Sequence, residues 1–374
     1  MTTVDSLYRP CRLCPRRCGA GRTISPGGKS AVPAGSGYCG ESAALRLACA
    51  SIHRGEEPPL TGGAGGGGSG TIFVSGCNLG CVFCQNWQIS AGLSANRQKR
   101  AWQISAGSLI ARRKCALQIS AGLAARQMPA GRPVLTEEFA RICLALQSRG
   151  AENINIVTGS HAVPALAAGI AAARAGISGG PAADRLRVPV LWNSSAYELP
   201  ETLDLLSDTV DVFLPDMKTL DGDISGRYCG APDYPAAAKE AVRKMMVMRS
   251  LRFEKAPGGG PDRMVSGVMI RHLVLPGHTE ATRTVLRWFA DHCAGRALLS
   301  LMFQYTPLGP GPQGSITRAE AGRVLGWLEE FGIDDGYCQE PVSGTTGWLP
   351  DFEKTNPFPS ELSVPVWHWR DGFA

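Results

Sequence analysis

The sequence predicts an α/β fold, a partial (β/α)6 barrel with a cysteine-rich N-terminal extension. The chain has 374 residues, 44% of them hydrophobic and 19% charged, enough for one large domain with a sizeable core. Along residues 71–305, six short apolar runs alternate with amphipathic segments of about a dozen residues, the pattern of parallel β–α–β units. A doubly wound open sheet is the second possibility. In a barrel, we expect the chemistry at the C-terminal ends of the strands.

The strands are recognised as short runs of β-branched and apolar residues, and each helix as a longer stretch with an apolar stripe. The expected strands are 71–75, 153–157, 188–193, 210–216, 267–275 and 297–304. The expected helices are 135–150, 163–176, 199–208, 234–248, 279–293 and 317–332. Gly150 and Gly176 are typical helix stops, because glycine adopts the backbone conformation that ends a helix.

Four further segments complete the predicted organisation. Residues 1–60 are rich in Cys, Arg and Gly and form a predicted metal-binding segment, and residues 61–70 read as a flexible glycine-rich linker. QISAG begins at residues 88, 103 and 118, so residues 93–130 are interpreted as an inserted repeat, either inert or docking a partner. Residues 306–374 are expected to form a C-terminal helix and an extended tail.

Composition narrows the class of protein. We expect a cytoplasmic location, because the N-terminus lacks an apolar signal region and no run of eighteen apolar residues is present. The net charge of +6 is too small and too dispersed to indicate nucleic acid as a partner, and no membrane partner is expected. Thirteen cysteines in a reducing compartment favour metal or catalytic roles over disulfides.

The segment SGCNLGCVFCQNW, directly after the first barrel strand, contains the most specific motif. Cys77, Cys81 and Cys84 form a C-x3-C-x2-C pattern, and three thiolates on one tight loop suit three irons of a [4Fe–4S] cubane. The fourth iron is then left for the amino and carboxylate groups of a methionine-like molecule. A structural zinc ion normally needs four ligands, and no fourth Cys or His follows nearby in sequence.

This motif resembles the signature of the radical S-adenosylmethionine (SAM) superfamily. The stretches CRLCPRRCG, EEPPLTG, NINIVTGSH, LPDMK, YCGAPDYPAAAKEAV and IRHLVLPG resemble its pyruvate formate-lyase activating enzyme-like branch. The resemblance implies that a reduced cluster gives one electron to SAM and that a 5′-deoxyadenosyl radical abstracts hydrogen from the substrate. The protein would supply ligation, orientation and exclusion of water.

Polar residues after the second and third strands are candidates for binding SAM. The resemblance implies this role by position for Thr158, Ser160 and His161, although better-known activating enzymes carry Gly-Gly-Glu there. The alternative is a polar cap at the strand end. Asn193 and Ser195 could contact ribose hydroxyls through their amide and hydroxyl groups, or could form an Asx-turn.

Charged residues near later strand ends are further candidates. Asp216 and Lys218 are two apart, so they point to the same face, and they could orient SAM, bind a substrate backbone or form a surface salt bridge. Arg271 lies inside an apolar run, where an unpaired charge is costly. Its expected partner is a carboxylate, either that of SAM or that of a protein side chain.

A second cysteine group lies near the N-terminus. Cys11, Cys14 and Cys18 form C-x2-C-x3-C, and Cys39 follows in SGYCGE. Four thiolates could close a zinc site or a second iron–sulfur cluster, with a structural or electron-relaying role. Disulfides are the alternative. The remaining cysteines, Cys229 among them, are scattered and interpreted as small core hydrophobes.

The function that the resemblance implies is that of a radical SAM enzyme that abstracts hydrogen from a substrate, such as a glycyl radical enzyme. A protein or peptide substrate and a one-electron donor such as flavodoxin or ferredoxin are the implied partners. Two other functions remain open, an iron–sulfur electron carrier and a zinc-stabilised binding protein without catalysis. The residues alone name no catalytic side chain.

Overall fold

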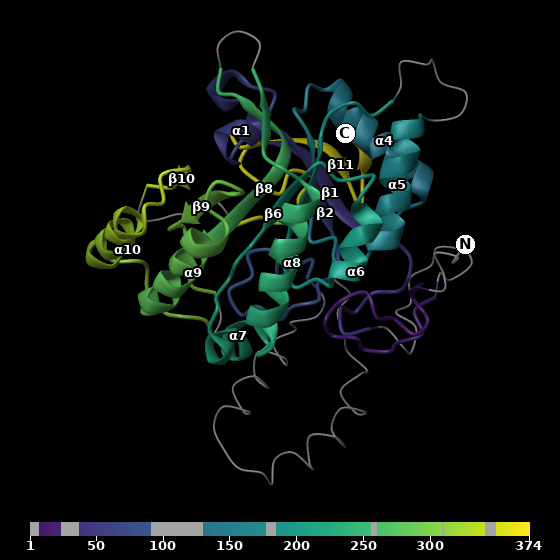
Figure 1. Cartoon of the computed structure of the whole chain (residues 1–374). Helices are drawn as coiled ribbons and strands as arrows, with labels where there is room; N and C mark the ends of the chain where they lie inside the picture. The colour runs from purple at the N-terminus through teal and green to yellow at the C-terminus, as the bar shows by residue number, and fades with distance from the viewer. Residues whose placement is uncertain are drawn as a thin grey trace.

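The structure, a computed structural model, describes residues 7–23, 37–90, 130–176, 185–255, 260–308, 310–340 and 349–374. It is a mixed α/β molecule built on one large sheet (Figure 1). The predicted repeat insertion, except for Ala130 at its end, lies outside the described residues.

Six strands in the parallel part of the sheet correspond to the six predicted strands and confirm the predicted α/β fold of a partial barrel. They are β2 (Ser69–Val74), β4 (Ile154–Val157), β5 (Val190–Ser194), β6 (Val212–Pro215), β8 (Arg263–Leu273) and β9 (Leu298–Met302). Each pairs in parallel with the next in this order, as expected for strands joined through helices. The C-terminal ends of these strands therefore meet along one edge of the sheet, where the polar candidates were predicted.

The helices lie along the outer face of the sheet (Figure 1). The longer ones are α4 (Thr136–Ser148), α5 (Val163–Ala175), α8 (Tyr234–Met248), α9 (Thr279–His292) and α10 (Arg318–Phe331). The shorter ones are α1 (Pro58–Thr61), η2 (Gly63–Gly65), α6 (Pro200–Leu203), η4 (Asp204–Leu206) and α7 (Gly222–Cys229). They bury their apolar sides against the sheet, and α10 begins with a capping box between Thr317 and Glu320. Within the described ranges, the helices lack the length or the apolar character needed to cross a bilayer.

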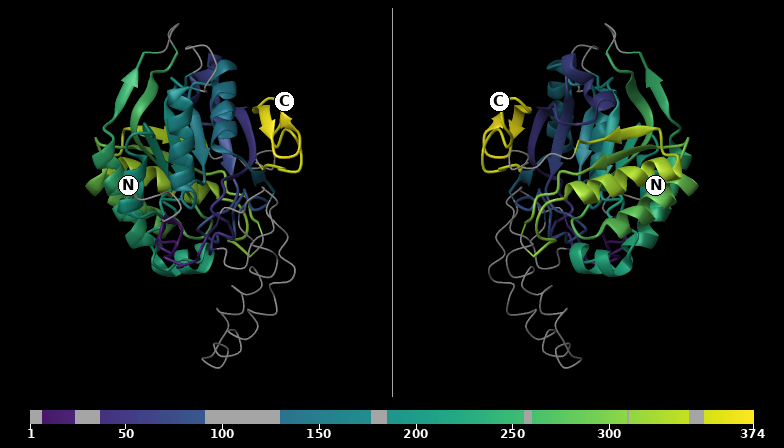
Figure 2. Two further views of the ribbon diagram at one scale, coloured as in Figure 1. Left: turned by 90° about the vertical axis from the view of Figure 1, so that its right-hand side faces the viewer. Right: turned by 90° about the vertical axis from the view of Figure 1, so that its left-hand side faces the viewer.

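The sheet also contains strands that were not predicted. Strand β1 (Arg46–His53) pairs antiparallel with β2, and β11 (Ser363–His368) pairs with β1 and with β12 (Gly372–Phe373). Figure 2 shows these C-terminal strands, in yellow, at the edge of the sheet. Smaller strands are β3 (Arg132–Pro133), β7 (Arg252–Glu254) and β10 (Gly336–Cys338). The end of the predicted tail is therefore part of the sheet, because β1 offers it a free edge.

The glycine-rich stretch differs from the predicted flexible linker. It contains η2, and β2 begins within it at Ser69. A Cβ at Gly66 would lie 2.1 Å from the Thr61 carbonyl oxygen, and one at Gly67 would lie 1.7 Å from the Gly150 carbonyl oxygen. The glycines therefore serve close backbone packing, which leaves no room for a side chain, and this segment is an ordered turn into the barrel.

Candidate functional site

The three central cysteines lie on the loop that follows β2. Gly76 starts this loop with φ +92°, and a Cβ there would lie 2.4 Å from Glu41 Cγ and 2.8 Å from His161 Nε2. Glycine is therefore required both by the backbone conformation and by the close neighbours. The loop is held in place because the Gly76 amide donates to the Ile89 carbonyl at 2.7 Å.

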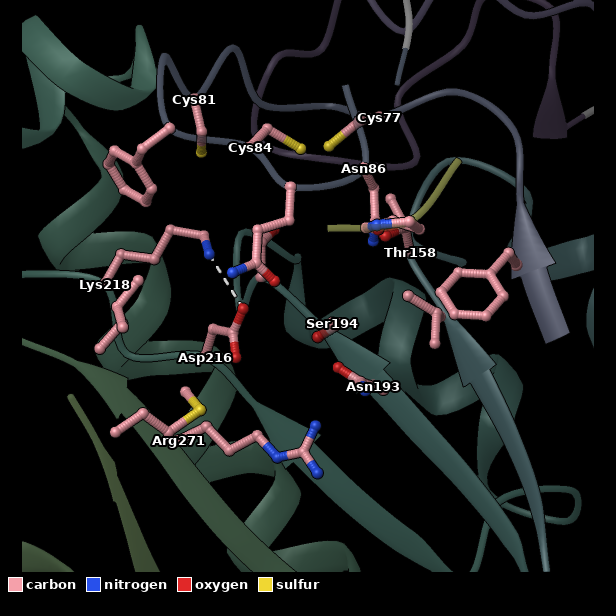
Figure 3. A pocket seen from close by; sticks show the side chains of 18 of the residues that line it. Cys77, Cys81, Cys84, Asn86, Thr158, Asn193, Ser194, Asp216, Lys218 and Arg271 are labelled. Carbon is pink, nitrogen blue, oxygen red and sulfur yellow. Dashed lines mark hydrogen bonds and ion pairs between the residues drawn. The ribbon is translucent and has the colours of Figure 1, made fainter. Parts of the chain in front are cut away.

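A cavity of about 280 Å3 opens at the C-terminal ends of the parallel strands. Cys77, Cys81 and Cys84 line it from one side, while Asp216 and Lys218 line the opposite side (Figure 3). The other predicted residues that line it are Thr158, Asn193, Ser195 and Arg271. The structure thus brings together nine of the eleven residues predicted for the central site.

The three thiols line one cavity, and a cubane cluster takes each thiolate at a different iron. Within the described part of the chain, no three His, Cys, Asp or Glu side chains are arranged to hold one metal ion. The thiols are half-buried and free, and burial raises the pKa of Cys84 to about 11. Binding them as thiolates therefore requires a strongly positive group such as iron.

Thr158, Asn193 and Ser195, the neutral polar residues predicted for the site, line the cavity at the ends of β4 and β5, together with Ser194 (Figure 3). Thr158 follows β4 with φ +66°, an unusual conformation for a β-branched residue, and its amide donates to the Asn193 carbonyl at 2.9 Å. Asn193 and Ser195 reach the same cavity from β5 and the residue after it. Backbone strain of this kind is often found at functional sites, where the surrounding fold maintains it.

Ser160 and His161 do not line the cavity. Both are buried, and Ser160 hydrogen-bonds the carboxyl group of Glu198, which also accepts from Trp192 and Ser194. His161 Nε2 lies 2.8 Å from the Ser75 carbonyl oxygen, and burial lowers the pKa of this imidazole to about 3. The neutral, buried His161 therefore stabilises the start of the cysteine loop from a position outside the cavity lining.

Asp216 and Lys218 form a half-buried ion pair, with 2.9 Å between Asp216 Oδ2 and Lys218 Nζ. Burial alone would lower the pKa of Lys218, but Asp216 and the Cys81 thiol raise it well above its ordinary value. Tyr234 supports the pair from α8 by donating from its hydroxyl to the Asp216 carbonyl at 2.6 Å. The lysine therefore stays protonated and faces the cysteines across the cavity.

Arg271 has protein carboxylates as partners. Its Nε donates to Glu57 Oε1 at 2.9 Å, and its Nη2 contacts both Glu56 and Glu57. Burial alone would raise the pKa of Glu57, but the charge of Arg271 holds it below its ordinary value. Of the two expected kinds of partner, the structure shows the protein acids, which come from the EEPPL stretch before α1.

The N-terminal cysteines gather around Arg22. Cys11, Cys14 and Cys39 are buried and Cys18 is exposed, and the described cysteines are all free thiols. Arg22 Nη1 lies 3.7 Å from Cys11 Sγ and donates to the His161 carbonyl at 2.7 Å. A side chain at Gly37 would meet Cys18 Sγ at 3.1 Å and Cys39 Sγ at 3.5 Å, so these two thiols flank one glycine.

This N-terminal segment packs directly on the loop of the central cysteines. Arg16 Nε donates to the Asn78 carbonyl at 3.0 Å, and the Asn78 side chain hydrogen-bonds Cys14 and donates to the Tyr197 carbonyl. Figure 1 shows the segment, in purple, below the sheet at the same end as the loop. Asn78 directly follows Cys77, so the two cysteine groups are neighbours in space.

Sequence reasoning missed several residues of the site. Glu56 lines the cavity beside Arg271, and Pro350 and Phe358 reach it from the C-terminal segment. Cys229 was interpreted as a core hydrophobe, yet its thiol hydrogen-bonds that of Cys81. The two adjacent carboxylates in EEPPL could have been matched to the buried Arg271, whereas nothing local marks the other contacts.

Comparisons with known proteins show which family the sequence matches. The family described as the radical SAM superfamily matches residues 71–289, more than half of the chain. An uncharacterized protein of Methanocaldococcus jannaschii is 25% identical over 334 residues, covering 88% of this chain and 77% of that protein.

Several solved structures are similar in outline. SuiB of Streptococcus suis, bound to its precursor peptide SuiA, is 12% identical with a TM-score of 0.40, covering 70% of this chain and 46% of SuiB. A domain of a pyruvate-formate lyase-activating enzyme from Bacteroides vulgatus is 11% identical with a TM-score of 0.30, and the match covers 41% of this chain and 81% of that domain. A radical SAM methyltransferase from Sphaerobacter thermophilus is 12% identical with a TM-score of 0.36, and the match covers 56% of this chain and 58% of the methyltransferase. The chain thus spans less than half the length of SuiB.

Proposed function

Because the chain belongs to the radical SAM superfamily, whose members are enzymes that cleave SAM by means of an iron–sulfur cluster, we propose that Cys77, Cys81 and Cys84 hold this cluster. The main support for the proposal is that all three thiols line the same cavity, at the C-terminal ends of the parallel strands. The [4Fe–4S] cluster and SAM together supply a one-electron reduction that produces a radical able to remove hydrogen from a substrate.

The chain's own residues would bind and orient SAM beside the cysteines. Thr158, Asn193 and Ser195 offer hydroxyl and amide groups from one side of the cavity. Asp216 and Lys218 line the opposite side of the cavity and are left free for the substrate in this arrangement. The apolar side chains of Leu79 and Phe83, on the loop itself, would limit the access of water to the cluster.

We propose a polypeptide as the substrate, such as the glycyl loop of a glycyl radical enzyme. The support is the resemblance to activating enzymes, together with the charged pair Asp216 and Lys218 at the cavity wall. An extended backbone offers both donors and acceptors, and this pair can bind both kinds of group. A one-electron donor such as flavodoxin or ferredoxin would complete the reaction.

Incubation of the reduced, reconstituted enzyme and SAM with a glycyl radical enzyme from the same source should yield an organic radical and 5′-deoxyadenosine together. Asp216→Asn should lower the ratio of radical to 5′-deoxyadenosine by about tenfold, because it weakens one charged hydrogen bond to the substrate. A tenfold change corresponds to about 1.4 kcal/mol. Electron paramagnetic resonance and chromatography measure the two products.

The matched control is Asp204→Asn, which removes the carboxylate of another ion pair, Lys244–Asp204, away from the cavity. It should leave the ratio unchanged. The polypeptide proposal fails if every glycyl radical enzyme of the source stays free of radical while a small molecule stimulates 5′-deoxyadenosine formation. Cleavage of SAM itself would survive that outcome.

A second metal centre at Cys11, Cys14, Cys18 and Cys39 is a further proposal. Its support is that Cys11, Cys18 and Cys39 interact with the buried Arg22, whose charge would offset that of bound thiolates, and that Cys14 interacts with Cys11 and Cys18. Four thiolates can bind either zinc or an iron–sulfur cluster. The hydrogen bond between Cys14 and Asn78 would suit a second centre that stabilises the central loop or relays electrons to it.

Cys14→Ala should remove the metal of this second centre and leave the signal of the central cluster in place, since the three central thiols are unchanged. Metal analysis of the wild type should find iron beyond the four atoms of one cubane, or zinc. Cys49→Ala, which removes a buried thiol of β1, is the control and should keep the full metal content. Only four irons and no zinc in the wild type would contradict the proposal.

A further inference from the structure

Cys229 is a fourth cysteine at the central site. It is the last residue of α7, 1% exposed, and its thiol hydrogen-bonds the thiol of Cys81. Gly230 follows with φ +66° and ends the helix there, so the Cys229 side chain is placed by a regular helix terminus.

The backbone fixes the two thiols relative to each other. The Gly80 amide donates to the Cys229 carbonyl at 2.9 Å, and the Val82 amide donates to the Tyr228 carbonyl at 2.8 Å. These two hydrogen bonds lie on either side of Cys81. The loop is therefore attached to α7 by its backbone at the point where the two thiols meet.

Cys229 is poorly placed to bind the cluster itself. Cys77, Cys81 and Cys84 line the cavity, whereas Cys229 is not among the described residues that line it. A cluster binds Cys81 as a thiolate, which has no proton to donate, so in the loaded enzyme the hydrogen bond must run from the Cys229 S–H to the Cys81 sulfur.

We propose that Cys229 is a positioning residue that donates a hydrogen bond to the sulfur of Cys81 and thereby raises the reduction potential of the cluster. Reduction adds negative charge to the cluster and its thiolates, and a hydrogen-bond donor at a ligand sulfur stabilises the more negative state. The inference rests on the proposed cluster at Cys77, Cys81 and Cys84. It assigns to Cys229 a role in how easily that cluster accepts its electron.

The test is a redox titration of the anaerobically reconstituted full-length enzyme, followed by electron paramagnetic resonance. Cys229→Ala removes the donor and should lower the ratio of reduced to oxidised cluster about tenfold at a fixed potential, which equals 59 mV for one electron. Cys229→Ser keeps a donor and should stay within about threefold of the wild type. Cys143→Ala, which removes a buried thiol of α4, should have the wild-type potential.

A Cys229→Ala enzyme with full cluster content and a wild-type potential would overturn the inference alone. Failure of both the Ala and the Ser variants to bind a cluster would also overturn it, because Cys229 would then be needed to build the loop. A wild-type enzyme that binds no cluster at the three central cysteines would instead remove the proposed function, and this inference with it. The three outcomes are distinguished by iron content measured before the titration.

Discussion

Cys81→Ala is expected to abolish SAM cleavage and to remove the central cluster. Cys81 is the middle cysteine of the loop and lines the cavity, so its loss leaves two thiols for three irons. Even outer partners of metal ligands contribute 10–100-fold to affinity or activity, so we expect at least about a 100-fold loss. The measurements are 5′-deoxyadenosine formed after dithionite reduction and the electron paramagnetic resonance signal.

Cys293→Ala is the matched control for this variant. Cys293 is fully buried just after α9 and lies outside the cavity lining, so its loss should reduce stability slightly and keep SAM cleavage. Full cleavage by Cys81→Ala would refute the proposed ligand set. A wild type that carries a cluster and never cleaves SAM would favour an electron carrier, and a colourless zinc protein would favour a binding protein.

Arg271→Ala is expected to lower the free energy of unfolding by about 3–5 kcal/mol. The arginine is 7% exposed, and its removal leaves the largely buried carboxylates of Glu56 and Glu57 without their cation. Denaturant unfolding at neutral pH measures the loss. Arg17→Ala removes the exposed Arg17–Glu201 pair and should change stability by at most about 1 kcal/mol.

Charge burial gives this loss a definite pH dependence. In the wild type, the pKa of Glu57 is held below its ordinary value, so the pair stabilises the fold above about pH 4.3 and this contribution falls as Glu57 takes up a proton in acid. In Arg271→Ala, burial remains the largest influence on Glu57 and raises its pKa against the hydrogen bonds from Ser300 and the backbone, so the variant regains stability as the pH falls. The difference between the two proteins should shrink from pH 7 to pH 4.

Neutralising the acids provides the decisive comparison. Arg271→Met combined with Glu56→Gln and Glu57→Gln should be more stable than Arg271→Ala, because no buried charge is left unpaired. An Arg271→Ala protein that keeps wild-type stability at neutral pH would show that these carboxylates reach water or another cation.

Local patterns were sufficient to predict the parallel part of the fold. The helix predicted over 234–248 coincides with α8, because its apolar residues recur at helical spacing and bury one face. The strand predicted over 153–157 corresponds to β4, whose four residues are all buried. Strand β11 escaped prediction because its partner, β1, lies more than 300 residues earlier, and pairing across that distance leaves no mark in either segment alone.

The candidate site likewise contains residues that local sequence patterns predict and contacts that they do not. C-x3-C-x2-C after a buried strand was enough to predict Cys77, Cys81 and Cys84 at one cavity, because the ligands lie on one short loop and the end of a parallel strand opens toward it. Asp216 and Lys218 were predicted to share a face, and their ion pair confirms it, since alternate residues of an extended chain point the same way.

The partners of individual side chains were decided by the tertiary structure. The sequence by itself determined that Arg271 needs a carboxylate, whereas the packing of α1 against β8 decided that Glu56 and Glu57 provide it. It also determined that Thr158, Ser160 and His161 are polar, whereas the folded structure decided that Thr158 lines the cavity and that the His161 imidazole lies against the Ser75 carbonyl. The physical reason is that spacing along the chain specifies direction within one element, while a contact such as Cys81 with Cys229 depends on two elements folding together.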